Sequence, residues 1–179
     1  MADFEVDTWP VGALETGRLV LREARELDRD GLVALLSSVE AYRYLGGAMP
    51  PEQAAEVVRA PYGTRHGSFV IRENESGEFV GAVNLKRRDQ DWPGSMGGAL
   101  DMGYLLLPEY WGKGYAQEAV GAVLRWLPTV VPDKQVVAVT QSANEASLRL
   151  LKKLGFVEVE RFEEFGAGQV LCAAELPHS

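Results

Sequence analysis

The segment PEYWGKGYAQEA, residues 108–119, decides the fold, because it places two glycines and a lysine directly ahead of a helical pattern. From Ala116 onward, apolar residues recur at the spacing of a helix that packs on a sheet. The preceding run ALDMGYLLL, residues 99–107, indicates a strand. The sequence therefore predicts strand, turn and helix, and Gly112 and Gly114 would let the backbone of the turn approach a ligand closely.

This turn is a candidate anion site, because the first amides of a helix have no internal partner and the positive end of the helix dipole lies behind them. Two known phosphate loops do not fit. A nucleotide-hydrolase loop needs Ser or Thr after Gly-Lys, whereas Gly114 follows Lys113 here. A dinucleotide-binding fingerprint needs a third glycine where Gln117 stands. The alternative interpretation is a turn that uses glycine only for its backbone conformation.

Composition limits the class of protein. The chain has 179 residues, 46% of them hydrophobic, which fits one globular domain. The net charge of −8 and the lack of a basic stripe disfavour nucleic acid as a partner. No apolar run approaches the ~20 residues of a membrane span, and the first residues lack the basic region of a signal peptide. The single cysteine, Cys172, fits a reducing compartment, so we expect a cytoplasmic protein. One cysteine and two scattered histidines make no metal-ligand cluster, so we expect no metal.

The periodicities predict the order β-α-α-β-β-β-α-β-α-β-β, a mixed α/β fold. We expect one domain over residues 16–177 after an N-terminal extension at 1–15. NESG at 74–77 is a hairpin turn, and 87–98 form a long glycine-rich loop. Strands are expected at 18–25, 68–73, 78–86, 99–107, 135–140, 156–163 and 169–176, and helices at 52–60, 116–127, 142–154 and after an N-cap at Asp28 or Asp30.

The stretches GYLLLPEYWGKGYAQEAV and NEASLRLLKKLGF resemble the GNAT superfamily of N-acetyltransferases, specifically the RimJ/RimL-like branch that acetylates ribosomal-protein N-termini. The opening TGRLVLREARELDRDGLVALLSSVEAYRYLGG is similar to the first strand and helix of that branch, and the similarity covers roughly residues 16–160. The resemblance implies a central, mostly antiparallel sheet flanked by helices, in which strand 99–107 splays from strand 135–140. Two departures are Trp111, where the superfamily has Gln or Arg, and SVE at 38–40, where the branch often has Asp-Pro-Glu.

The resemblance also implies acetyl-CoA as co-substrate, with its pantetheine arm between the two splayed strands. Asn144 would bond that arm, although it is also a candidate helix cap, as is Ser142 in a capping box with Glu145. The pyrophosphate would be held mainly by the backbone amides of Gly112, Lys113, Gly114, Tyr115 and Ala116.

In the implied reaction an amine attacks the thioester carbonyl, and the resulting oxyanion must be stabilised. A backbone amide of Leu105, Leu106 or Leu107 would supply that contact, freed by a bulge that interrupts strand pairing. The sequence leaves the choice among these three open, and all three are also ordinary core residues of a strand. The resemblance also implies that Ser147 lies near the sulfur as a proton donor, and this role is favoured because a serine inside a helix has no structural advantage over alanine.

A general base matters because the amine must arrive unprotonated. A lysine-type amine, with a pKa of about 10.4, needs that help far more than an α-amine near 7.7–8.0. Asp101 is the candidate, a carboxylate inside an otherwise apolar strand that would act through water. The alternative is that Asp101 faces solvent and makes a cross-strand contact, and Glu23 is a weaker second candidate for the base.

These observations predict an acetyl-CoA-dependent N-acetyltransferase that moves the acetyl group directly to a primary amine. The acceptor is a protein N-terminus or a small-molecule amine such as an antibiotic, and the acidic chain suits a cationic one. Another acyl group such as succinyl stays open, and homodimerisation is an expectation from the family alone. The alternatives are a non-catalytic acyl-CoA sensor or partner-binding module on the same fold, and a structural protein without a ligand.

Overall fold

An eight-stranded sheet forms the centre of the protein in the residues that its computed structural model describes, which are 4, 9, 12–59, 61, 65–89 and 97–177. The strands are β1 (Leu14–Glu15), β2 (Leu19–Arg22), β3 (Ser68–Glu73), β4 (Phe79–Arg87), β5 (Leu100–Leu106), β6 (Gln135–Gln141), β7 (Val157–Glu164) and β8 (Ala167–Glu175). The helices are α1 (Arg29–Leu36), α2 (Pro51–Val57), α3 (Tyr115–Trp126) and α4 (Glu145–Lys153), with short 3-10 turns η1 (Glu26–Asp28), η2 (Pro108–Tyr110) and η3 (Leu127–Thr129).

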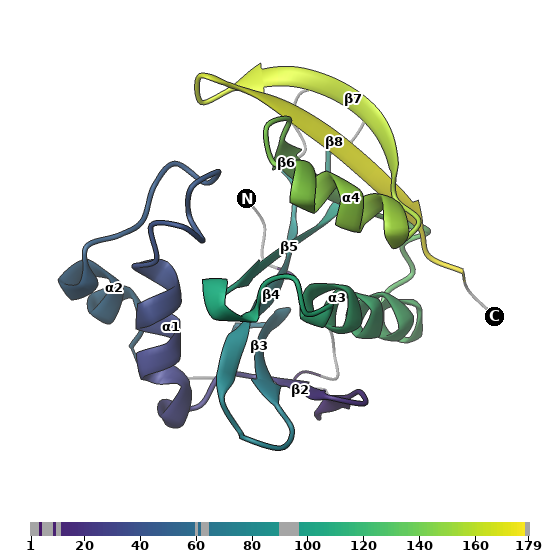
Figure 1. Ribbon diagram of the computed structural model, residues 1–179. Coiled ribbons are helices and arrows are strands. Elements are labelled where there is room, and N and C mark those ends of the chain that lie inside the picture. The colour runs from purple at the N-terminus through teal and green to yellow at the C-terminus, as the bar shows by residue number, and fades with distance from the viewer. Residues whose placement is uncertain are drawn as a thin grey trace.

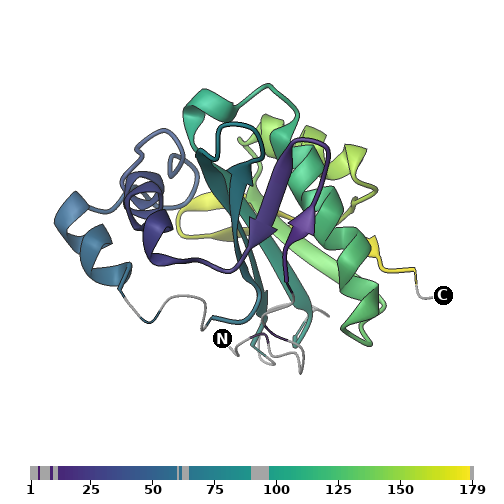
Figure 2. The same cartoon turned by 90° about the horizontal axis from the view of Figure 1, so that it is seen from below.

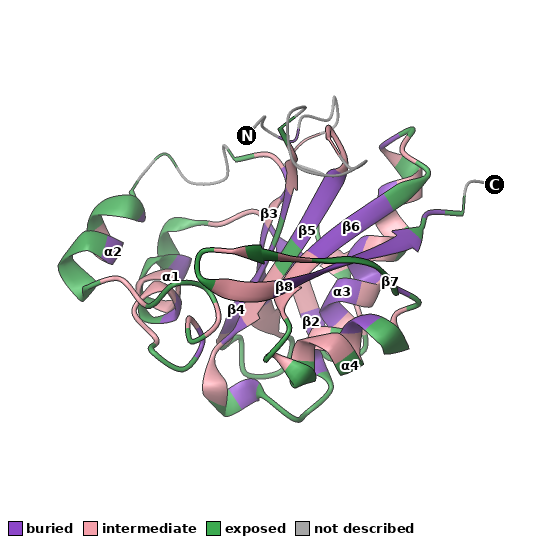
Figure 3. Ribbon diagram, turned by 90° about the horizontal axis from the view of Figure 1, so that it is seen from above, coloured by how far each residue is buried: buried purple, intermediate pink, exposed green. Residues whose placement is uncertain are grey.

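Helices cover the sheet on both faces, with α1 and α2 on one side and α3 and α4 on the other (Figures 1 and 2). Helix α3 buries Ala119, Val120 and Val123 in the main core. Helix α1 packs Leu35 against Ala82 in a smaller cluster. The central strands are therefore buried, whereas β7 at the sheet edge is largely exposed (Figure 3). This arrangement confirms the predicted mixed α/β fold with flanking helices.

The strand order is β1-β2-β3-β4-β5-β6-β8-β7, and β5 with β6 is the parallel pair in an otherwise antiparallel sheet. These two strands pair only where they start, at Leu100 with Val136 and at Asp101 with Val137. Beyond those pairs they diverge, which confirms the predicted splay. The divergence leaves one edge of β5 without a strand partner inside the sheet.

Local sequence signals fix the ends of α4. Asn144 caps the helix, because its side-chain oxygen accepts a hydrogen bond from the Ser147 amide at 3.2 Å. The helix therefore begins at Glu145, and the expected capping box from Ser142 is wrong. At the other end Gly155 adopts a φ of 87°, and the amide of Phe156 donates back to the Leu151 carbonyl at 3.0 Å. This pattern is a Schellman cap, and it confirms that the glycine ends the helix.

Asp28 has a different role from the expected one. Its side chain does not cap α1, because the carboxylate is fully buried and bonds Arg22 at 2.7 Å and Arg72 at 2.5 Å. The Arg25 amide is a third donor, at 2.8 Å. Burial raises the pKa of Asp28, but the hydrogen bonds from Arg22, Arg25 and Arg72 outweigh it and hold the pKa below its ordinary value. The aspartate thus ties the start of α1 to β2 and β3.

The N-terminal segment contributes to the core. Phe4 is 1% exposed within the main cluster, and Trp9 packs on Phe69 with ring centroids 5.0 Å apart. Strand β1, which the periodicity does not indicate, begins before the expected boundary at residue 16. Most of the expected glycine-rich loop, residues 90–96, lies outside the described residues. Among the described residues, no helix is long and apolar enough to cross a membrane.

Candidate functional site

The glycines of the turn are required by its backbone. Gly112 has a φ of 70° and Gly114 a φ of 80°, both in the left-handed region that side chains rarely adopt. A Cβ at Gly112 would meet no atom within 4 Å, and one at Gly114 would meet only the end of the Arg18 side chain. The backbone conformation, rather than crowding, therefore explains why glycine stands at these two positions.

The turn presents backbone amides at the N-terminus of α3. The first hydrogen bond of the helix runs from the Glu118 amide to the Gly114 carbonyl at 3.1 Å, so the amides ahead of it have no helical acceptor. Gly112, Lys113 and Gly114 are all exposed, and the ammonium of Lys113 lies 5.4 Å from the centre of the Tyr110 ring. The amides, a nearby cation and the helix dipole together suit a negatively charged group.

The backbone of β5 has one edge bonded to β4 and one directed toward β6. The Leu107 amide donates to the Val80 carbonyl at 3.0 Å, and the Ala99 carbonyl accepts from the Arg88 amide at 3.0 Å. Between these bonds the register with β4 is unbroken. Because backbone direction alternates along a strand, the odd-numbered residues of β5 face β4 and the even-numbered residues face β6.

Among the three candidate leucines, Leu106 is therefore the one whose amide faces the divergence from β6, as the amides of Met102 and Tyr104 also do. The amides of Leu105 and Leu107 point to β4, which removes them as donors to a ligand in the gap. The predicted bulge in this part of β5 is wrong, since its pairing with β4 shows no register shift. The spreading of β5 from β6 frees the Leu106 amide instead.

Trp111 links the turn to the free edge of β5. Its indole nitrogen donates to the Leu106 carbonyl at 2.9 Å, and the residue is 49% exposed. Trp111, which stands where the superfamily has Gln or Arg, thus holds the end of β5, which carries the Leu106 amide, close to the glycine turn.

Asp101 is buried, at 3% exposure, so the solvent-facing alternative is wrong although the cross-strand contact exists. Its carboxylate lies 3.0 Å from Arg88 and 3.5 Å from Lys86, which is its partner across β4 and β5. Burial raises the pKa of Asp101 above its ordinary value, and the two cations oppose that rise only in part. Asp101 is also the last residue of β5 that pairs with β6, so it lies where the divergence begins.

On the opposite face of β5, Tyr104 reaches α4. Its hydroxyl and that of Ser147 lie 2.7 Å apart, and burial raises the pKa of Tyr104 to about 12. The pair spans the space between the diverging strand and the helix, next to the Asn144 cap. Tyr104 therefore stays protonated through neutral pH and is able to donate a hydrogen bond.

Comparison with known proteins agrees with this geometry. Residues 18–157 match the family model described as an acetyltransferase (GNAT) domain. The chain is 30% identical to the uncharacterised N-acetyltransferase YoaA of Bacillus subtilis (strain 168), over 80% of this chain and 81% of that protein. The chain belongs to the GNAT acetyltransferase family. The expectation of an enzyme is thereby confirmed, and the superfamily resemblance with it.

Solved GNAT structures share the fold. An acetyltransferase of the GNAT family from Bacillus anthracis superposes with a TM-score of 0.78 at 19% identity, covering 91% of this chain and 98% of that one. Spermidine N-acetyltransferase from Vibrio cholerae, solved in complex with CoA and spermine, has a TM-score of 0.73 at 17% identity, covering 90% and 97%. At these identities the likeness concerns the fold alone.

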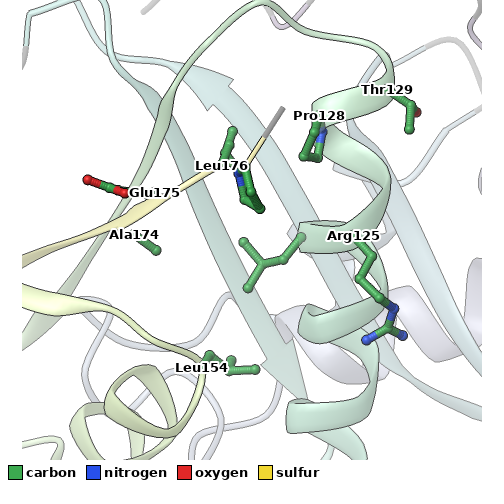
Figure 4. Close-up of a pocket in the computed structure, with 9 residues that line it drawn as sticks. Arg125, Pro128, Thr129, Leu154, Ala174, Glu175 and Leu176 are labelled. Carbon is green, nitrogen blue, oxygen red and sulfur yellow. The ribbon is translucent and has the colours of Figure 1, made fainter. Parts of the chain in front are cut away.

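In this GNAT chain a cavity of about 600 Å³ lies away from the glycine turn, at the other end of α3 (Figure 4). Its lining residues are Leu124, Arg125, Pro128, Thr129, Leu154, Ala174, Glu175, Leu176 and Pro177. Since a helix rises about 1.5 Å per residue, the length of α3 separates this cavity from the candidate site. Among the residues described, no group of three or more His, Cys, Asp or Glu suits a metal ion.

The structure thus gathers most of the predicted site residues of this GNAT enzyme around β5. Asn144 and Ser147 meet it from α4, and the glycine turn continues from its end. Sequence reasoning missed Tyr104. A tyrosine in an apolar strand was the only signal, and the packing of α4 is what brings its hydroxyl to Ser147. Glu23, the weaker candidate base, lies instead after β2, 3.8 Å from Arg25.

Proposed function

We propose that this GNAT enzyme uses acetyl-CoA and transfers its acetyl group directly to a primary amine. The observation that carries the proposal is the glycine turn at the start of α3, held beside the end of β5, where β5 no longer pairs with β6 and the Leu106 amide faces away from β4. Coenzyme A has a diphosphate and a pantetheine arm with amide groups. The amides of the turn and Lys113 suit the diphosphate, and the free edge of β5 suits the pantetheine arm.

Each residue has a stated task in this proposal. The amides of residues 112–116 hold the diphosphate, and Asn144 bonds the pantetheine arm with the part of its side chain that the helix cap leaves available. The Leu106 amide donates to the carbonyl oxygen of the acetyl thioester, which is the reactive group that the co-substrate supplies. Losing one such donor typically costs about 10²–10³ in rate.

The two proton-handling groups lie on opposite faces of β5, because Asp101 and Tyr104 differ by an odd number of positions in a regular strand. Asp101 accepts the proton of the amine, through water, on the α1 side of the sheet. Ser147, hydrogen-bonded to Tyr104, donates a hydrogen bond that stabilises the departing thiolate on the α4 side. This separation supports direct transfer in a ternary complex, since neither group has to change role.

The acceptor that we propose is a cationic primary amine, as the net charge of −8 suggests. A protein N-terminus, as in the RimJ/RimL-like branch, belongs to this class. A polyamine, such as the spermidine after which the Vibrio cholerae enzyme is named, belongs to it as well. A panel with an α-amine peptide, spermidine and a lysine side-chain analogue, assayed by the mass of acetylated product, distinguishes them.

The first experiment is calorimetric titration of acetyl-CoA into the wild type and into Gly114→Leu. Gly166→Leu is the matched control, because Gly166 also has a positive φ, 73°, but lies in the β7–β8 turn. We expect the wild type and Gly166→Leu to bind and Gly114→Leu to lose binding. A folded wild type that does not bind acetyl-CoA would overturn the proposal. Binding without turnover on any amine would instead favour an acyl-CoA sensor.

A further inference from the structure

Arg18, in the connection between β1 and β2, touches the glycine turn from a segment far away in the sequence. Its Nη1 donates to the carbonyl oxygen of Lys113 at 2.9 Å. Its guanidinium carbon lies 4.5 Å from the centre of the Tyr115 ring, at the first residue of α3. The side chain therefore contacts the turn and the start of the helix at once.

Glu118 fixes that arginine in place. One carboxylate oxygen accepts from Arg18 Nε at 2.7 Å, and the other accepts from the Arg18 amide at 2.8 Å and from the Thr16 hydroxyl at 2.6 Å. Partial burial raises the pKa of Glu118, but the hydrogen bonds from Thr16 and Arg18 outweigh it and leave the pKa below its ordinary value. Glu118 is consequently ionised at neutral pH and holds the guanidinium in one orientation.

The bond to the Lys113 carbonyl determines where the next amide points. In a trans peptide the carbonyl of one residue and the amide of the next lie in one plane and point in opposite directions. Since Arg18 holds the Lys113 carbonyl, the Gly114 amide points in the opposite direction within the same plane, away from the arginine. A glycine at φ 80° would otherwise allow this plane to rotate at little cost.

We infer that Arg18, held by Glu118, is a positioning residue that aims the Gly114 amide at the diphosphate of the acyl donor. The inference rests on the proposed function. It differs from a simple attraction between the arginine and the phosphate, because the Glu118 carboxylate already offsets the positive charge. Geometry, rather than charge, is then what Arg18 supplies, and lysine cannot reproduce the two-pronged contact of a guanidinium.

The test uses Arg18→Lys and Glu118→Gln in the full chain, with binding measured calorimetrically. Acetyl-CoA is compared with acetyl-pantetheine, which lacks the diphosphate and so does not use the turn. We expect both variants to bind acetyl-CoA about tenfold more weakly, the range for losing a charge-assisted hydrogen bond. Affinity for acetyl-pantetheine, or its KM where binding is too weak to titrate, should stay unchanged.

The control is Arg161→Lys, which removes a comparable exposed arginine pair with Glu158 on β7, at 2.6 and 2.7 Å, away from the turn. It should bind acetyl-CoA as the wild type does. Unchanged acetyl-CoA affinity in Arg18→Lys would overturn the inference, and so would tighter binding by Glu118→Gln, which is the result for an attraction by charge. Equal weakening with both donors would indicate a general structural role and also overturn it. A wild type that does not bind acetyl-CoA refutes the proposed function itself.

Discussion

Two of the arginine–carboxylate groups that connect distant segments of this protein have different surroundings. Asp28 is fully buried between Arg22 and Arg72, where it ties the start of α1 to β2 and β3. Glu118 holds Arg18 at the surface, with the arginine side chain 47% exposed. The two groups have similar short contacts, so distance alone does not distinguish them.

Because the two groups differ in burial, removing one partner should have different effects on the stability of the protein. A carboxylate withdrawn from water depends on its partners, because removing one side leaves an uncompensated buried charge. An exposed pair contributes little to folding, since water and salt screen it. The buried group should therefore control stability, whereas the exposed group should matter for the shape of the turn that it touches.

The largest effect on stability should come from Asp28→Asn. The variant leaves Arg22 and Arg72 without the carboxylate, and we expect the free energy of unfolding to fall by about 3–5 kcal/mol. Equilibrium denaturation in urea measures it, with Glu145→Gln as control because Glu145 forms an exposed pair with Arg149 on α4. A loss below about 1 kcal/mol would mean that burial does not separate the two groups.

The same comparison predicts a pH dependence. The pKa of Asp28 is lowered from its ordinary value of 3.8 when the chain folds. A lowered folded pKa means that the contribution is complete above the unfolded value and is lost as pH falls through the folded one. The stability gap between wild type and Asp28→Asn should thus be constant near neutral pH and close in acid below about pH 4. Denaturation curves at several pH values measure this gap, and a gap that persists in strong acid would contradict the assignment.

Asp101 provides an intermediate case, a buried carboxylate whose pKa is raised and not lowered. Its partners do not fully offset the cost of burial, but the substitution also leaves the largely buried Arg88 without the carboxylate, so Asp101→Asn should lower the free energy of unfolding by less than Asp28→Asn does. Turnover should nevertheless fall about a hundredfold at neutral pH, within the usual range for a general base. The paired measurement is urea denaturation and steady-state rate on the best amine acceptor. Destabilisation as large as that of Asp28→Asn, with normal turnover, would assign Asp101 to structure instead.

The features that sequence could predict are those that neighbouring residues determine. Gly112 and Gly114 imply positive φ angles, Gly155 implies the end of α4, and the hairpin at 74–77 follows from its turn residues. The resemblance to the GNAT family added the splay between β5 and β6, which no local pattern indicates.

What sequence could not predict depends on pairing across the fold. The choice of Leu106 among three adjacent leucines required the register of β5 with β4, since alternation reverses the direction of each amide. Asp28 was expected to be a helix cap, and its actual role was missed because Arg72, the arginine on β3 that bonds it, is distant in sequence. The Tyr104–Ser147 contact likewise required the position of α4 over the sheet.

The smallest effect on stability should come from Arg18→Lys. A small effect is informative, because it separates a role in folding from a role in binding. The pair with Glu118 is screened at the surface, so we expect a change in unfolding free energy of less than about 1 kcal/mol, several times below that of Asp28→Asn. Urea denaturation of both variants in one buffer, at low and high salt, measures the contrast. If Arg18→Lys is as unstable as Asp28→Asn, then the surface group also supports the fold, and weakened acetyl-CoA binding could follow from that instability. If Arg18→Lys is as stable as the wild type, a loss of acetyl-CoA binding is explained by a changed orientation of the turn.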